Sequence, residues 1–153
     1  MAGRIAIQRE DFDVAAEVAA LTRGRTDIGA IVTFAGLCRD EGGRLAALEL
    51  EHYPGMAEAE IAAVAQEARA RWPLLGLTVI HRTGLIAPGA QIVLVAAASA
   101  HRAAAFAAAD FLMDYLKSRA PFWKKERRID GTDGGWVAAK DSDDAALARW
   151  GGP

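Results

Sequence analysis

The chain has 153 residues, of which 52% are hydrophobic and 25% are charged, and its formal net charge is −2. These values fit one globular domain over residues 1–153 and exclude a disordered or fibrous chain, while the slight acidity argues against general nucleic-acid binding. We expect a cytoplasmic protein, because there is one cysteine, no secretory leader pattern and no apolar stretch near the roughly 18 residues of a membrane helix.

The first half of the sequence predicts alternating strands and helices. In chain order these are a strand at 4–8, a helix capped by Asp11 or Asp13, a strand at 28–37, a strand at 45–53, and a helix opened by Pro54-Gly55 and ended by Pro73. The stretch 28–37 is rich in β-branched and apolar residues, which is typical of a buried strand. A short glycine-bearing loop follows, so we expect 28–37 and 45–53 to pair as a hairpin.

The second half predicts two more strands, a long helix and a small C-terminal unit. The elements are strands at 77–82 and 91–98 around a turn at 84–89, an alanine-rich helix at 100–118, a strand at 136–139, and a helix capped by Asp141 or Ser142. Ser99 stands at the expected N-cap of the long helix, and Phe106, Met113 and Leu116 can pack from it. Pro121 prevents that helix from continuing. The elements together predict an α+β fold.

Positive charge is concentrated between Lys117 and Arg128, although the whole chain is slightly acidic. Such a cluster predicts a site for a small anionic ligand. Pro121 must turn the chain between Lys117 and Lys124, and a turn could bring both amines to one pocket, where a partly desolvated amine acts as base or nucleophile. Lys117 is the better catalytic candidate, because it lies one helical turn after Met113 and so beside a packing face. A solvated basic run is the open alternative.

Two further positions predict contacts with an anion. His101 and Arg102 stand in the first turn of the long helix, where free backbone N–H groups favour a bound phosphate. A surface arginine and a packing or capping histidine remain the alternative. Arg39 follows the predicted strand at 28–37, and its planar fork suits a phosphate, although a pair with its acidic neighbours would also explain it. Cys38 is interpreted as a small buried hydrophobic residue rather than a nucleophile.

Six segments, in order, resemble the large subunit of molybdopterin synthase. They are Gly29-Ala-Ile-Val-Thr-Phe-Ala-Gly36 with Arg39, Leu50-Glu-His-Tyr-Pro-Gly-Met56, Arg71-Trp-Pro73, Val79-Ile-His-Arg82, Ser99-Ala-His-Arg102, and Met113-Asp-Tyr-Leu-Lys-Ser-Arg-Ala-Pro-Phe-Trp-Lys124. Any one segment would be weak evidence. The likeness covers nearly the whole chain, and its last segment is almost unbroken.

This resemblance implies an α/β hammerhead-like domain with an additional antiparallel β subdomain. It also implies a homodimer that binds one small ubiquitin-like sulfur-carrier subunit at each end, giving a heterotetramer. In that family the carrier's C-terminal Gly-Gly enters the pocket as a thiocarboxylate, and two sulfur atoms pass to cyclic pyranopterin monophosphate. The implied activity is therefore a sulfurtransferase of molybdenum cofactor biosynthesis. No metal or cofactor is implied, because the carrier supplies the sulfur.

The resemblance also assigns roles to residues. The family's essential lysine falls on Lys117 and its second lysine on Lys124, so both are expected to be catalytic. The expected substrate contacts are Arg39, His101, Arg102, Lys117, Lys124 and Lys125. In the family, the histidine–arginine pair at the helix start reaches the pocket from the neighbouring protomer. Phe34 and Met113 match apolar pocket-lining positions.

Two features depart from the family pattern. Leu37 stands where many members have a lysine, and the loop at 40–43 is shorter and more acidic than usual. Two other classes of function remain open at this stage. One is a module that binds a phosphorylated pterin or a ubiquitin-like tail without chemistry, and the other is an RNA-binding protein that uses the basic residues of 117–128.

Overall fold

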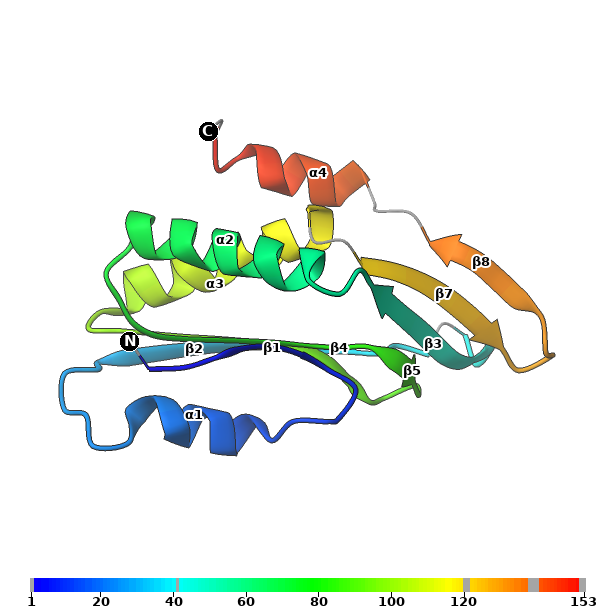
Figure 1. Ribbon diagram of the computed structural model, residues 1–153, viewed down its shortest axis with the longest axis horizontal. Helices are drawn as coiled ribbons and strands as arrows, with labels where there is room; N and C mark the ends of the chain where they lie inside the picture. Colours follow the sequence, from blue (N-terminus) through cyan, green and yellow to red (C-terminus); the bar gives the residue numbers. More distant parts are fainter. Residues whose placement is uncertain (1, 41, 120–121, 138–140, 152–153) are drawn as a thin grey trace.

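The computed structural model describes residues 2–40, 42–119, 122–137 and 141–151, and their strands form two four-stranded sheets (Figure 1). The first sheet has the order β1-β4-β6-β2, with β1 at Ile5–Gln8, β4 at Leu74–Arg82, β6 at Gln91–Ser99 and β2 at Ala30–Leu37. The second sheet has the order β5-β3-β7-β8, with β5 at Gly84–Ile86, β3 at Leu45–His52, β7 at Phe122–Arg128 and β8 at Asp133–Val137. All pairs in the second sheet are antiparallel.

Helices cover both faces of the first sheet. Figure 1 shows α1 (Val14–Thr22) on one face, and α2 (Met56–Arg71) and α3 (Arg102–Ser118) on the other. The last helix, α4 (Asp141–Ala148), packs against α3. The second sheet extends beyond the helices at one end of the molecule. The predicted α+β class with an additional antiparallel sheet is therefore confirmed.

The main core lies between the first sheet and its two long helices. The inner strands β4 and β6 are buried along most of their length, because each has a neighbour on both sides and helices over the sheet. Ile61 of α2, with Phe111 and Leu112 of α3, packs there at 0% exposure. Burying one such side chain contributes roughly 1.5–3 kcal/mol. Apolar packing thus makes this part of the molecule a rigid support.

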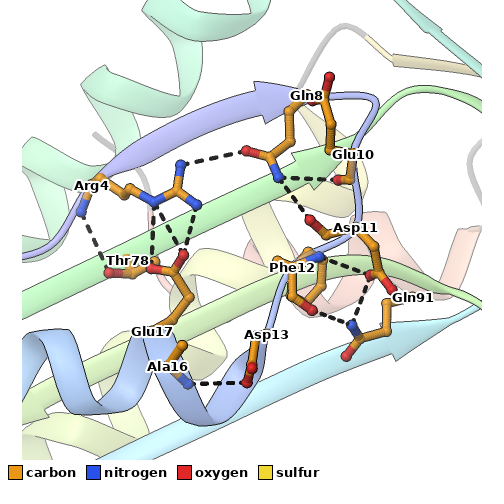
Figure 2. Close-up of polar contacts among 10 residues, drawn as sticks. All are labelled: Arg4, Gln8, Glu10, Asp11, Phe12, Asp13, Ala16, Glu17, Thr78 and Gln91. Carbon is orange, nitrogen blue, oxygen red and sulfur yellow. Dashed lines mark hydrogen bonds and ion pairs between the residues drawn. The ribbon is translucent and has the colours of Figure 1, made fainter.

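A polar network ties α1 and the loop before it to the first sheet (Figure 2). Asp13 caps α1 by accepting a hydrogen bond from the backbone three residues on, at 3.1 Å, which confirms one of the two predicted caps. Arg4, the residue before β1, pairs with Glu17 of α1 at 2.6 Å. Asp11 instead accepts a hydrogen bond from the side chain of Gln91, at 2.8 Å, and so joins the loop before α1 to β6.

Two predictions about the strand after residue 28 are wrong. The strand β2 does not form a hairpin with β3, because it pairs along its length with β6, and β3 pairs with β5 and β7 in the other sheet. Nor is β2 buried: it is the edge strand of the first sheet, and Phe34 and Leu37 are 41% and 56% exposed. A short loop allows a hairpin but does not require one, since pairing follows the packing of whole faces.

The start of the long helix also differs from expectation. Ser99 is the buried last residue of β6, and its hydroxyl donates to the carbonyl of Pro73 at 2.8 Å. The N-cap of α3 is His101, whose side chain makes no capping hydrogen bond. Phe106 is 62% exposed and does not pack in the core, whereas Leu116 does. The cap was misplaced by two residues because β6 continues to Ser99.

The segment at 122–128, for which the sequence predicted no element, is β7, an inner strand of the second sheet. The turn at 84–89 contains the short strand β5, and the strand expected at 136–139 begins at Asp133 as β8. Pro121 and residues 138–140 lie outside the described residues. None of the helices in the described part of the chain is both long enough and apolar enough to cross a membrane.

Candidate functional site

The two lysines expected to be catalytic come from different elements. Lys117 lies exposed in the last turn of α3, and Lys124 lies half-buried in the middle of β7. Both amines are within electrostatic reach of one imidazole, that of His81 on β4, because the positive charge of each lowers its pKa. The fold therefore brings a helix end and a strand of the second sheet to the same buried side chain.

His81 stands where the two sheets meet. It belongs to an inner strand of the first sheet and is 7% exposed. Its ring stacks on that of Phe122, the first residue of β7, with centroids 3.8 Å apart and planes 13° apart. The Nδ1 atom lies 2.8 Å from the carbonyl oxygen of Arg82. A carbonyl only accepts, so Nδ1 carries the proton and Nε2 keeps its lone pair.

The imidazole of His81 is neutral at ordinary pH. Burial is the main reason that its pKa falls from 6.5 to about 4, since an apolar site disfavours the charged form. The positive charges of Lys124, His52 and Lys117 lower the pKa as well, whereas the hydrogen bond to Arg82 raises it. The site thus combines two positively charged amines with an uncharged imidazole.

A second histidine completes this cluster. His52 ends β3 opposite Phe122 in the strand register, and the two ring centroids are 6.2 Å apart. Its Nε2 lies 3.4 Å from a carboxylate oxygen of Glu58, in the first turn of α2. Hydrogen bonds from the backbone N–H groups of Glu58 and Gly55 lower the pKa of that carboxyl. We refer to Lys117, Lys124, His52, His81 and Phe122 as the lysine site.

The predicted phosphate pair lies at the opposite end of α3. His101 is the N-cap and Arg102 the first residue of the helix, and both are exposed. At about 1.5 Å per residue, the rise from Arg102 to Lys117 is about 22 Å. Within one chain, therefore, this pair does not meet the lysine site. The first turn of α3 contains no acidic residue that would offset its positive charge.

The remaining predicted residues are spread around the first and second sheets. Arg39 is exposed just after β2, at the predicted junction of strand and loop. Phe34 is exposed on β2, and Met113 packs half-buried against the main core. Lys125 projects from the face of β7 opposite to that of Lys124, because successive residues of a strand alternate. There Lys125 is 3.3 Å from Asp133 and lies over the ring of Trp136.

Cys38 is buried at 2% exposure in a small apolar cluster, as predicted. A hollow of about 730 Å³ lies elsewhere, at the far end of the second sheet. Its lining residues are Gly43, Arg44, Leu45, Glu126, Arg128, Ile129 and Asp130. None of the residues predicted to act on a substrate lines it.

Sequence reasoning gave no role to the two histidines of the lysine site. His52 and His81 stand in two of the segments that carry the family resemblance, Leu50–Met56 and Val79–Arg82. The sequence did offer one sign of a role for His81, because a histidine interrupts an otherwise apolar strand. That role could not be predicted, since it depends on stacking with Phe122, which lies 41 residues after His81 in the sequence.

The lysine site gathers positive charge at the junction of the two sheets, an arrangement suited to binding anionic groups. The family model for the MoaE protein matches residues 7–119, which is well over half of the chain. The chain therefore belongs to the MoaE family.

Individual proteins agree with this assignment. The molybdopterin synthase catalytic subunit of Mesorhizobium japonicum is 71% identical over 150 residues, which cover 98% of this chain and 94% of the relative. The solved structure of a molybdopterin biosynthesis MoaE protein from Burkholderia ambifaria has a TM-score of 0.84 at 51% identity and covers 99% of each chain. A protein–protein complex of subunits 1 and 2 of the molybdopterin-converting factor from Helicobacter pylori contains the same fold, with a TM-score of 0.72 at 19% identity over 90% of each chain.

Proposed function

We propose that this chain is the sulfur-transferring, catalytic subunit of a molybdopterin synthase. It takes sulfur from the thiocarboxylated C-terminus of a small carrier subunit and places two sulfur atoms on cyclic pyranopterin monophosphate. The observation that supports this proposal is that Lys117 and Lys124, from two different elements, both lie near enough to the buried imidazole of His81 for their positive charges to lower its pKa. Two ammonium groups suit a reaction between two anions, a thiocarboxylate and a phosphate-bearing pterin.

The two lysines have different roles in this proposal. Lys117, exposed at the end of α3, contacts the incoming thiocarboxylate, and Lys124 holds the bound pterin or its half-sulfurated form. Once the thiocarboxylate sulfur has bonded to the pterin, a thioester joins the two partners, and water attacks its carbonyl carbon. The acyl C–S bond then breaks, so that the sulfur stays on the pterin and the tail leaves as a carboxylate, and negative charge develops on the carbonyl oxygen during this step. A fixed ammonium group stabilises that charge more than it stabilises the ground state, which lowers the barrier. Arg39, exposed just after β2, extends the positive surface, whereas Lys125 faces Asp133 and Trp136 on the other side of β7.

A second copy of the chain supplies the phosphate contacts. His101 and Arg102 lie about 22 Å from Lys117 along α3, so they join a lysine site only across a dimer. Phe34, with 41% exposure on the edge strand β2, and Phe106, with 62% exposure on α3, are apolar groups that such a contact would cover. Phe34 and Met113 then line the pocket beside the substrate.

The second partner is a small ubiquitin-like carrier protein. The structural relative from Helicobacter pylori was solved as a complex of the two subunits of its molybdopterin-converting factor, which supports a two-subunit assembly here. Two carriers on one homodimer give a heterotetramer. The chain acts as a single domain in the cytoplasm, and neither a metal nor an organic cofactor is needed, since the carrier brings the sulfur.

The proposal is tested by reconstitution. Purified chain, thiocarboxylated carrier and cyclic pyranopterin monophosphate are mixed, and the dithiolene product is quantified. The wild-type chain forms product, and Lys117→Ala lowers the rate by about 100-fold or more because a positioned catalytic group is lost. Arg149→Ala is the matched control. It removes a cation that pairs with Asp110 and Asp114 of α3, the helix that carries Lys117, and it leaves the rate unchanged.

Two results would contradict the proposal. Full activity of Lys117→Ala excludes a catalytic role for this lysine. Binding of both carrier and pterin by the wild-type chain, without product, identifies a non-catalytic binding module instead.

A further inference from the structure

The register of β7 connects His81 to one of the two lysines. Phe122 and Lys124 are two residues apart on the same strand, so their side chains project from the same face. Phe122 is the residue on which His81 stacks, at 3.8 Å. The place of the Lys124 amine therefore depends on how Phe122 is seated.

His81 itself has little freedom. Its backbone is held in an inner strand, paired with Ile7 of β1 and Val93 of β6. Its ring is held by the hydrogen bond from Nδ1 to the carbonyl of Arg82, at 2.8 Å, and by the stacked ring of Phe122. The first sheet thus presents a fixed flat surface to the beginning of β7.

This contact joins two regions that otherwise differ in rigidity. The first sheet is packed by buried apolar side chains, whereas β7 is half-exposed over most of its length. A mobile lysine would lose the alignment that group transfer needs, and an error of about 1 Å in such a position can cost about 100-fold in rate. A rigid element that seats Phe122 is therefore useful to the site.

We propose that His81 is a positioning residue of the lysine site, whose imidazole, stacked on Phe122 and fixed by the Arg82 carbonyl, holds Lys124 in place. This inference rests on the proposed function for its catalytic consequence, but the placement of Lys124 can be measured without any reaction. An aromatic ring at position 81 is the feature required. The nitrogen atoms fix the orientation of that ring.

Chemical labelling of lysines measures the placement directly. The folded chain is treated with a trace of an amine-acylating reagent, and the ratio of label on Lys124 to label on Lys125 is read by mass spectrometry. Lys125 is the internal reference, because it lies on the same strand but faces Asp133 and Trp136 on the opposite side. His81→Leu, which fills the space without a flat ring, is expected to change this ratio at least about threefold and to lower kcat about tenfold or more.

Two variants separate positioning from general destabilisation. His81→Phe keeps the stack and is expected to hold the labelling ratio and kcat within about twofold of the wild type. Val79→Ala opens a cavity at a fully buried position two residues earlier on the same face of β4, and it leaves the ratio unchanged even though it lowers stability. If His81→Leu does not fold, Phe122→Leu removes the other ring of the stack and gives the same shift.

An unchanged labelling ratio in His81→Leu or Phe122→Leu overturns the inference. So does a loss in His81→Phe as large as that in His81→Leu, because the ring would then not be the positioning element. The proposed function can fail separately: a wild-type chain that makes no dithiolene product leaves the labelling experiment intact.

Discussion

The first and second sheets differ in the side-chain interactions that stabilise each of them. In the first sheet, β4 and β6 are almost wholly buried, and apolar side chains from α2 and α3 pack against them. In the second sheet, β7 is half-exposed and is bound to its neighbours partly by ion pairs. Arg127 lies 2.8 Å from Glu49 on β3 and 2.6 Å from Asp133 on β8.

This difference explains why the lysine site lies where the first and second sheets meet. Buried apolar strands are rigid, but they cannot carry solvated charges, whereas an exposed strand can carry lysines but is not rigid by itself. The contact between His81 of the first sheet and Phe122 of the second combines the two properties. Variants on either side of the junction should therefore differ in kind: stability losses in the first sheet and activity losses at β7.

The largest effect is expected in the core of the first sheet. Phe111→Ala removes a fully buried ring that also contacts Trp72, Tyr115 and Trp150. It should lower the free energy of unfolding by about 3–5 kcal/mol, because the transfer term and the cavity term add. Urea denaturation measures this loss. A loss below about 1 kcal/mol would be close to the effect of a surface substitution. It would show that the first sheet is not the rigid region.

The buried histidine makes stability depend on pH. In the unfolded chain His81 takes up its proton near pH 6.5, whereas in the folded chain it does so only at about 4. The unfolded state therefore binds more protons between these values, and the free energy of unfolding falls as the pH falls through this window. The total loss is on the order of 3 kcal/mol.

His81→Phe should flatten that part of the profile. Denaturation midpoints measured at several pH values across the window, for the wild type and for this variant, provide the test. Profiles that fall in parallel would mean that His81 is not the titrating group. Titration of carboxyl groups would affect both chains equally.

The alternation of β7 gives the third prediction. Lys124→Ala should lower the rate of dithiolene formation by about 100-fold, equivalent to about 2.7 kcal/mol of transition-state stabilisation. Lys125→Ala should lower it much less, because Lys125 projects from the other face, toward Asp133 and Trp136. Single-turnover rates of the two variants, compared at saturating carrier, decide this. Equal losses in the two variants would mean that the rate depends on the total positive charge of β7 and not on the face from which each lysine projects.

The smallest effect is expected for the ion pairs of the second sheet. Arg127→Gln breaks the contacts with Glu49 and Asp133, but the group is 41% exposed and its pairs are screened by water and salt. A shift of a few degrees or less in Tm at low ionic strength should shrink further at high ionic strength. Thermal denaturation at two salt concentrations tests this. A large, salt-independent shift would mean that the second sheet is held together much as the first is.

Local chemistry made much of the fold predictable. Asp13 was one of two predicted caps of α1, and Pro73 was predicted to end α2, because capping and the missing N–H of proline act within a few residues. The family resemblance predicted the added antiparallel sheet, which the structure confirms, and assigned catalytic roles to two lysines, which stay a prediction. The hairpin of β2 with β3 was wrong because strand partners are chosen by whole faces, and β2 found its partner in β6, more than fifty residues away.

The sequence by itself determined the types of most elements, the family, and the identity of the charged residues at the end of α3 and along 122–128. Only the tertiary structure decided that 122–128 is a strand, that Lys124 and Lys125 face opposite ways, and that His81 stacks on Phe122. The physical reason is the separation along the chain over which each interaction acts. Propensity, capping and charge act between near neighbours in the chain, whereas stacking and desolvation depend on which distant segments the packing of the core brings together.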